Sequence, residues 1–583
     1  MDNMCLKEEK GRRQMKNSLA HRSACVCVLV ASLSALSACG GSGGGSNSPV
    51  PPQMYTIGGS VTGLASGASI VLLDNNGDAL TVSANGTFVF ATALSSGSTY
   101  AITVKTQPTG QTCSVSAGSG TVGSANVSNV VVSCTTNTYT IGGTIQGLSS
   151  SGLVLANGSD TLKVSANATG FTMPTAVTDS TAYDVTVESN PPALSCTVTN
   201  GTGTVASADV TNISVSCQPG AESVLYSFKG GTTDGAYSYS TLIQANDGNL
   251  YGTTSFGGAN GAGTVFKITP GGAESVLYSF KGGTTDGGGP LGSLIQASDG
   301  DLYGVTATGG ANGYGSVFKV TLSGTESILY SFKGGTTDGD PRYGGSSLIQ
   351  ASSGNFYGVT YQGGASSDGI VFELTPGGSE TVLYSFKGGT TDGSHPSDNV
   401  IQASDGNFYG TTSAGGANGD GVVFKITPSG NESVLYAFKG GTTDGAAPYG
   451  GLIQATDGNL YGMTLQGGTS NAGVAFKITP SGTESVLYAF KGGTTDGGAP
   501  YVNLIQASDG NFYGMTSSDG ASGDGVIFKI TPSGSETVLY SFLGGATDGA
   551  TPYGGLIQAS DGSLYGVTYQ GGASNYGTVF QFN

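Results

Sequence analysis

A tandem repeat of about 52 residues occupies the chain from residue 222 to residue 583. Each repeat carries four strand-like runs, which in the first repeat are 223–228, 241–245, 249–254 and 263–269. Four short strands in a unit of this length are typical of a β-propeller blade. The sequence therefore predicts an all-β protein with a seven-bladed β-propeller at residues 222–583. The anchor of each repeat is a Val-Leu-Tyr-Ser-Phe string or a close variant, with its tyrosine at Tyr226, Tyr278, Tyr330, Tyr384, Tyr436, Tyr488 and Tyr540.

The two ends of the repeat region are complementary. The region begins with a lone strand at 223–228, and its last repeat, 556–582, has three strand-like runs with no fourth behind them. We expect the leading strand to complete the last sheet, because closure removes the exposed edges that an open sheet must protect. The alternative is a linear solenoid, which needs distinct caps at both ends, and no caps are visible in the sequence.

Turn signals place the loops of each repeat on two rims. Asp-Gly turns such as 405–406 and the Pro-Ser-Gly type at 428–430 are short hairpin connections. Because strand direction alternates, both short turns should lie on one rim. The two long glycine-rich loops of each repeat should then share the opposite rim, which is where a rigid scaffold commonly carries its binding residues.

Two copies of a smaller unit precede the repeat, at residues 55–135 and 136–218. The string at 55–64 matches that at 139–148, and apolar and polar residues alternate in both, as in half-buried strands. A length of about 80 residues suits a small immunoglobulin-like β-sandwich. The chain is therefore expected to carry two such modules before the propeller.

Four cysteines fall within these two modules. Cys113 and Cys134 are 21 residues apart, and so are Cys196 and Cys217. One disulfide inside each module is the simplest pairing, and it requires an oxidising compartment. A four-cysteine zinc site is the alternative, but it needs closely spaced cysteine pairs that are absent here.

The N-terminus has the pattern of an export signal. An apolar stretch at 24–38 is too short to span a membrane, which favours a signal peptide over residues 1–38. It ends in Leu-Ser-Ala-Cys-Gly at 36–40, which resembles the lipobox of bacterial lipoproteins. That resemblance implies lipidation of Cys39, and glycine rather than aspartate at position 40 implies the outer membrane. Residues 39–54 are then a lipid anchor with a flexible linker, and Met15 is an alternative start. A plain secretion signal is the competing interpretation.

The repeat resembles the Gloeobacter/Verrucomicrobia-type tandem repeat, whose hallmark is a Leu-Tyr-Ser-Phe run, a Gly-Gly and Asp-Gly loop, and a Leu-Tyr-Gly-Thr-Thr run. The resemblance covers residues 222–583. It implies no particular enzymatic activity.

Composition excludes several classes of function. The formal net charge is −18, so the surface repels phosphate backbones and nucleic acid is not an expected partner. His395 is the one histidine and Arg342 the one arginine after Cys39, too few for the copper site of propeller oxidases or the arginine cluster of sialidases. No phosphate-binding loop, zinc-protease motif or nucleophile elbow is present.

An aspartate before glycine recurs in the first long loop of every repeat. Seven carboxylates on one rim could bind a hard cation such as Ca²⁺. The alternative is that each caps its own Asx-type turn, which repetition in every unit favours. No other cofactor is expected. The residues are Asp234, Asp286, Asp338, Asp392, Asp444, Asp496 and Asp548.

A second candidate site lies where the repeats are irregular. The third loop is two residues longer and contains Asp340, Arg342 and Tyr343, and the equivalent loop of the next repeat contains His395. These residues could form one ligand-binding patch, or they could reflect neutral drift among repeats. Loop tyrosines could stack on sugars or simply pack the loops, and they are Tyr237, Tyr239, Tyr343, Tyr449, Tyr501 and Tyr553.

Together these features predict a non-enzymatic, lipid-anchored protein of the cell envelope that displays the propeller to a glycan or a protein, periplasmically or on the cell surface. A glycan hydrolase or lyase is the first alternative, and it would need a pocket with two unrepeated acids, such as Asp340 with Asp398. An inert structural spacer is the second.

Overall fold

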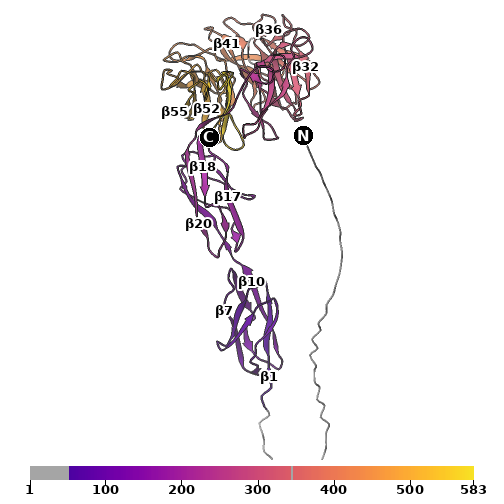
Figure 1. The fold of residues 1–583 in the computed structure, drawn as a ribbon, viewed down its shortest axis with the longest axis vertical. Coiled ribbons are helices and arrows are strands. Elements are labelled where there is room, and N and C mark those ends of the chain that lie inside the picture. Colours follow the sequence, from indigo (N-terminus) through magenta and orange to yellow (C-terminus); the bar gives the residue numbers. More distant parts are fainter. Residues whose placement is uncertain (1–50, 343, 345) are drawn as a thin grey trace, which may run out of the picture.

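The computed structural model describes residues 51–342, 344 and 346–583, and every regular element in them is a β-strand. In Figure 1, two elongated bodies of strands follow each other end to end, and the C-terminal residues form a broad disc at the end of the row. Across the described ranges no helix is long and apolar enough to cross a membrane. The signal peptide, Cys39 and most of the predicted linker lie outside the described residues.

The first elongated body, residues 54–136, consists of two four-stranded sheets around one core. One sheet has the order β5-β2-β10-β8 and the other β4-β3-β7-β9, while β1 pairs with β6 at one end. Ile57, Leu72 and Val132 are fully buried between the sheets. The strands are β1 (Met54–Tyr55), β2 (Ile57–Thr62), β3 (Ile70–Asp74), β4 (Asp78–Val82), β5 (Gly86–Val89), β6 (Leu94–Ser95), β7 (Thr99–Thr106), β8 (Gln111–Ser116), β9 (Ser119–Thr121) and β10 (Val127–Thr136).

The second elongated body, residues 138–219, repeats this topology, as its matching sequence predicts. Its sheets have the orders β15-β12-β20-β18 and β14-β13-β17-β19, with β11 paired to β16. The strands are β11 (Thr138–Tyr139), β12 (Ile141–Gln146), β13 (Val154–Asn157), β14 (Asp160–Lys163), β15 (Gly170–Thr172), β16 (Val177–Thr178), β17 (Ala182–Ser189), β18 (Leu194–Thr199), β19 (Thr202–Thr204) and β20 (Val210–Pro219). We call these two bodies the two-sheet units.

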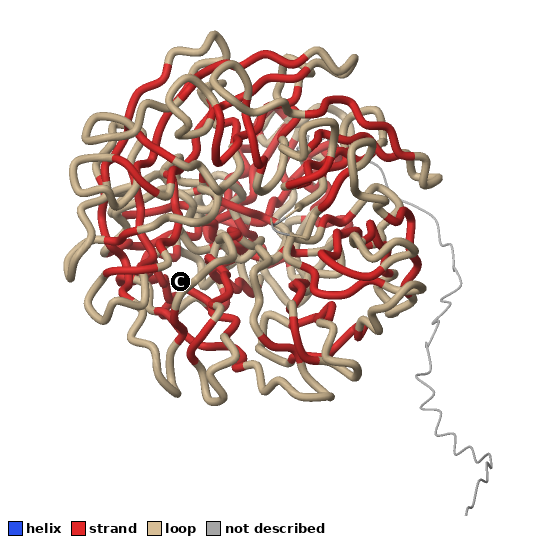
Figure 2. Tube along the Cα trace, turned by 90° about the horizontal axis from the view of Figure 1, so that it is seen from above, coloured by secondary structure: helices blue, strands red, loops and turns tan. Residues whose placement is uncertain are grey.

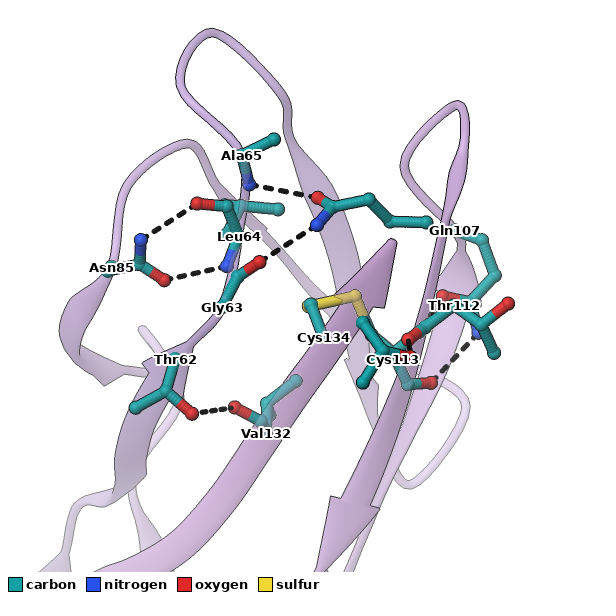
Figure 3. The surroundings of a disulfide bond; sticks show 12 residues. Thr62, Gly63, Leu64, Ala65, Asn85, Gln107, Thr112, Cys113, Val132 and Cys134 are labelled. Atoms are coloured by element: carbon teal, nitrogen blue, oxygen red, sulfur yellow. Dashed lines mark hydrogen bonds between the residues drawn. A yellow bond between two sulfur atoms is a disulfide. The ribbon is translucent and has the colours of Figure 1, made fainter. Parts of the chain in front are cut away.

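Each two-sheet unit contains the predicted disulfide. Cys113 on β8 lies directly opposite Cys134 on the antiparallel strand β10 and is bonded to it (Figure 3). Cys196 and Cys217 are bonded in the same way between β18 and β20. Nearby, the side-chain amide of Asn85 accepts a hydrogen bond from the backbone N–H of Leu64 and donates one to its carbonyl. These two hydrogen bonds hold the loop after β2 in place.

Removing one disulfide should destabilise only the unit that contains it. Each bond closes a loop of 21 residues, so its loss should cost about 3 kcal/mol. For Cys113→Ser with Cys134→Ser, we expect the calorimetric transition of the first unit to move to lower temperature while the others stay in place. The matched pair Cys196→Ser with Cys217→Ser should move the second transition instead. A single shift common to all transitions would contradict independent units.

The described residues of 222–583 form seven antiparallel sheets of four or five strands, together with five two-stranded ribbons, arranged in a ring that we call the sheet ring (Figure 2). One sheet has the order β23-β24-β26-β27, with β23 (Ile243–Gln244), β24 (Leu250–Thr254), β26 (Thr264–Ile268) and β27 (Glu274–Ser279). Sheets with the same four strands lie within 349–385, 453–489 and 505–541, and the sheets within 287–331 and 393–437 have these four strands and one more. The predicted runs 241–245, 249–254 and 263–269 coincide with β23, β24 and β26, whereas the run 223–228 belongs to another sheet of the ring.

The seventh sheet joins the two ends of the ring. Its order is β21-β60-β58-β57, in which β21 (Glu222–Ser227) is the leading strand. The other three come from the end of the chain, as β57 (Ile557–Gln558), β58 (Leu564–Thr568) and β60 (Thr578–Phe582). Strand β21 pairs with β60 from Glu222 opposite Phe582 to Ser227 opposite Thr578. The closure predicted from the two ends is therefore confirmed.

Apolar side chains fill the space between neighbouring sheets, so each sheet is stabilised by the next. Between the seventh sheet and the first, Phe228, Leu250 and Phe266 pack against Tyr565 and Val579. The Phe228 and Phe266 rings meet edge to face at 5.1 Å. Similar clusters lie between other neighbouring pairs, and the closing junction is as well packed as an internal one.

The long loops and the short turns lie on opposite rims, as predicted. The two long loops around the first sheet pair with each other in a ribbon that the sequence did not reveal, β22 (Gly235–Ala236) with β25 (Phe256–Gly257). The second two-sheet unit contacts the short-turn rim, where the Asn190 N–H donates to the Asp561 carbonyl at 3.0 Å. The long-loop rim therefore faces away from the two-sheet units.

Candidate functional site

A cavity of about 390 Å³ opens among the first long loops of the sheet ring. We call it the axial cavity, because all seven repeats contribute to its lining and they can meet only at the centre of the ring. Each repeat supplies residues from the segment between its Asp-Gly and its Ile-Gln pair. The described lining is Tyr239, Thr241, Leu291, Gly292, Ser293, Arg342, Gly344, Ser347, Ser397, Asp398, Tyr449, Tyr501, Val502, Asn503 and Tyr553.

Four tyrosines form a continuous wall of the cavity. Tyr449 and Tyr501 have ring centres 4.9 Å apart, Tyr501 and Tyr553 5.1 Å, and Tyr553 and Tyr239 5.5 Å. They occupy the same position in successive repeats, directly after a proline or, in the first repeat, after Ser238. Burial raises the pKa of each of the four, so their hydroxyls stay neutral at physiological pH. Sequence reasoning flagged these tyrosines, and the structure places them side by side.

Asp398 is the single carboxylate among the described lining residues. Its oxygens accept hydrogen bonds from the Ser347 hydroxyl at 3.0 Å, the Asn503 amide at 2.7 Å and the Gly451 backbone N–H at 3.3 Å. Burial raises the pKa of this carboxyl above its ordinary value. These three donors come from the third, fifth and sixth repeats, so the side chain is fixed by the ring as a whole.

The predicted patch around the irregular loop is only partly assembled. The Arg342 guanidinium binds the Asp340 carboxylate through two nitrogens, with the shorter contact at 2.6 Å, and it lies over the Tyr314 ring at 4.4 Å. Arg342 reaches the cavity, but Asp340 is buried in the pair and does not line it. Tyr343 lies outside the described residues.

His395 is directed elsewhere. Its ring packs on Tyr361 at 4.7 Å, and its Nδ1 lies 2.8 Å from the Ser394 hydroxyl. It is not among the described residues that line the cavity. The expectation that Arg342 and His395 share one ligand site is therefore not met, because each has a separate aromatic partner.

The seven aspartates of the first long loop each organise their own turn. Asp444, which is 4% exposed, accepts from the Tyr436 hydroxyl at 2.7 Å and from the backbone N–H groups of Lys439 at 2.8 Å and Gly445 at 2.7 Å. The other six have the same three kinds of donor. Over the described ranges, no three His, Cys, Asp or Glu side chains gather in a way that could hold a metal ion. The structure thus gives each aspartate the turn role and does not collect them into a calcium site.

Replacing one of these carboxylates should destabilise the sheet ring. In Asp444→Asn, an amide nitrogen replaces one carboxylate oxygen, so whichever way the amide is turned at least one buried backbone N–H, that of Lys439 or that of Gly445, loses its acceptor. We expect a loss of about 3 kcal/mol in the free energy of unfolding, measured by chemical denaturation. Asp184→Asn, at an exposed side chain of the second two-sheet unit, is the matched control and should change stability by under about 0.5 kcal/mol. An equal, small effect of both would contradict the turn role.

Seven glutamates between neighbouring sheets were not anticipated from the sequence. Each begins an outer strand and approaches the tyrosine–aspartate pair of the preceding sheet, as Glu380 does at 3.3 Å from the Tyr330 hydroxyl. One carboxyl oxygen of each is buried without a hydrogen-bond partner. Burial, with the charge of the nearby aspartate, raises the pKa of each to about 7, and the residues are Glu222, Glu274, Glu326, Glu380, Glu432, Glu484 and Glu536. The only sequence signal was a glutamate before every anchor strand.

The fold and the repeated loops define a β-propeller-like repeat protein. The model of the Gloeobacter/Verrucomicrobia repeat matches residues 193–403 and 344–580, and the chain belongs to this family. The predicted family resemblance is thereby confirmed. No curated protein matches the chain.

Solved structures show distant likenesses. Virginiamycin B lyase from Staphylococcus aureus is 16% identical, with 62% of this chain and 98% of that chain covered and a TM-score of 0.40. The extracellular domain of a putative hybrid two-component system from B. thetaiotaomicron is 12% identical, with 63% and 44% covered and a TM-score of 0.38. A fungal alcohol oxidase in complex with copper is 15% identical, with 62% and 75% covered and a TM-score of 0.38. Similarities this low carry no argument about activity.

Proposed function

We propose that the chain is a cell-envelope binding protein that presents the axial cavity to a glycan. In this proposal Cys39 carries the lipid anchor, the two-sheet units are immunoglobulin-like modules that form a stalk, and the sheet ring is a seven-bladed propeller. The observation that carries the proposal is the cavity itself, with its tyrosine wall and its unrepeated polar side chains.

The arrangement of the parts supports display away from a membrane. The anchor would lie before the first two-sheet unit, and the ring lies at the other end of the row (Figure 1). The second unit contacts the short-turn rim through Asn190, so the cavity loops occupy the opposite, free rim. Two disulfides agree with an exported protein.

The cavity lining suits a saccharide. Tyrosine rings offer apolar faces to the C–H groups of a sugar, and pockets of this kind orient their ligands with a few fixed polar groups. Here those groups are the Asp398 carboxylate, the hydroxyls of Ser293 and Ser397, and the Arg342 side chain. The ring holds them in place, so the cavity is formed before a ligand arrives.

The two alternative functions receive less support. Hydrolysis by paired carboxylates needs two acids facing the substrate, but Asp340 is held by Arg342 outside the lining, and Asp398 faces the cavity without a second acid from the described residues. A structural spacer would need only the residues that recur in every repeat. It would not need Asp398, which the other repeats lack, or tyrosines that occur in only some of the repeats.

A glycan array probed with the full chain and with Tyr501→Ala tests the proposal. We expect the wild-type chain to bind a defined set of the glycans and Tyr501→Ala to bind them at least tenfold more weakly. Tyr183→Ala, in the second two-sheet unit, is the control and should bind as the wild-type chain does. Binding of no glycan by the wild-type chain, or binding that is unchanged in Tyr501→Ala, would contradict it.

A further inference from the structure

The side chains that face the axial cavity depart from the repeat, although the rest of each loop follows it. At the position of Asp398, the first, second, fifth, sixth and seventh repeats have Ser240, Gly292, Gly450, Val502 and Gly554. The turn-forming aspartate of each loop recurs in every repeat, as does the Ile-Gln pair after it. The other repeats therefore pack and form their turns without an acid at this position. We infer that Asp398 serves the cavity and is not needed for the fold of its loop.

The charges around the cavity do not balance. Arg342 is bound by Asp340, and these two charges offset each other within one ion pair. Asp398 is held by a hydroxyl, an amide and a backbone N–H, all of them neutral donors. Asp340, Arg342 and Asp398 together therefore carry a formal charge of −1 when Asp398 is ionised. A carboxylate removed from water is costly unless a positive charge approaches it.

The tyrosine wall also favours a positively charged ligand. The faces of aromatic rings attract cations, and they attract them more strongly where water is excluded. Tyr239, Tyr449, Tyr501 and Tyr553 lie together on the wall, and Asp398 belongs to the same lining. A net charge of −18 on the chain also concentrates cations near it.

We propose that the sugar entering the axial cavity carries a free amino group, which is protonated and pairs with Asp398 while the sugar ring stacks on the tyrosine wall. This inference rests on the proposed glycan-binding function and specifies its ligand as an unacetylated amino sugar. Acetylation would remove the positive charge and add bulk, so the N-acetylated sugar is the ligand that the cavity discriminates against.

Three disaccharides with the same β-1,4 linkage separate the charge from the sugar ring. They are the glucosamine disaccharide, its fully N-acetylated counterpart and cellobiose, each titrated into the full chain by isothermal calorimetry or ligand-observed NMR. We expect the glucosamine disaccharide to bind at least tenfold more tightly than either neutral sugar, the factor of one charge-assisted hydrogen bond. This preference should shrink as salt is added.

The variant Asp398→Asn should abolish the preference, so that the glucosamine disaccharide binds no more tightly than cellobiose. Asp457→Asn, at a surface ion pair with Lys477, is the matched control and should keep the preference. If Asp398→Asn does not fold, the salt titration of the wild-type chain still decides the question. Equal binding of all three sugars, or tighter binding of a neutral one, overturns this inference and leaves the glycan proposal standing. Binding of none overturns both.

Discussion

The sheet ring is expected to lose stability as the pH rises from about 5 to about 8. The seven glutamates between neighbouring sheets have pKa values raised to about 7 by burial and by the adjacent aspartates, as in Glu274 beside Asp234. In the unfolded chain they return to about 4.5, so the folded state binds more protons between these values. The stability that they contribute is complete below about pH 4.5 and is lost as the pH rises through 7.

The size of this effect follows from the number of copies. Solvent screening reduces the contribution of each glutamate well below that of a full shift, and at about 0.7 kcal/mol for each, seven together change the free energy of unfolding by about 5 kcal/mol. Asp247, Asp405 and Asp457 have lowered pKa values, so their contribution is lost only below the acidic end of this window.

Chemical denaturation between pH 5 and pH 8 measures the effect. Glu274→Gln should flatten the pH dependence by about one seventh and should stabilise the ring at pH 8. Glu188→Gln, at an exposed glutamate of the second two-sheet unit, should leave it unchanged. A ring that becomes more stable from pH 5 to pH 8 would mean that the buried carboxyls are already ionised at pH 5.

The second large effect is expected at the junction that closes the ring. Phe266 faces the seventh sheet and Phe318 occupies the equivalent position one sheet further along, and both are 0% exposed. Each change to alanine should cost about 3–5 kcal/mol, the range for a buried phenylalanine. Equal losses are the signature of a closed ring, because Phe266 is covered by residues from the last part of the chain only when the two ends meet.

Urea denaturation of the two variants side by side makes this comparison. Phe256→Ala is the control for aromatic truncation on the surface, since that ring is 53% exposed, and it should cost under about 1 kcal/mol. A loss for Phe266→Ala well below that for Phe318→Ala would show that the closing junction is open in solution.

The fold was largely predictable from the sequence because its signals are local and recur seven times. Alternating apolar residues, Asp-Gly turns and the lone leading strand were sufficient to predict the strands of the first repeat and the pairing of β21 with β60. The ribbon of β22 and β25 was missed, since two glycine-rich loops carry no strand pattern. The four-residue tyrosine wall was visible only as separate loop tyrosines.

The site was less predictable because its side chains come from different repeats and meet only in the folded ring. Asp398 meets Asn503 across a separation of 105 residues, and no pattern in one repeat indicates that contact. Arg342 and His395 were linked in the sequence by their rarity, whereas their side chains follow different aromatic partners, Tyr314 and Tyr361. The glutamates between sheets were hidden by their regularity, since a repeated acid at a strand start is typical of a solvent-facing residue.

A crystal structure of the full chain soaked with the glucosamine disaccharide would show whether the axial cavity binds an amino sugar. We predict sugar density in the axial cavity, with a ring against Tyr449 and Tyr501 and an amino nitrogen within hydrogen-bond distance of Asp398. Density on the outer surface of the sheet ring, with the cavity filled only by water, would contradict it.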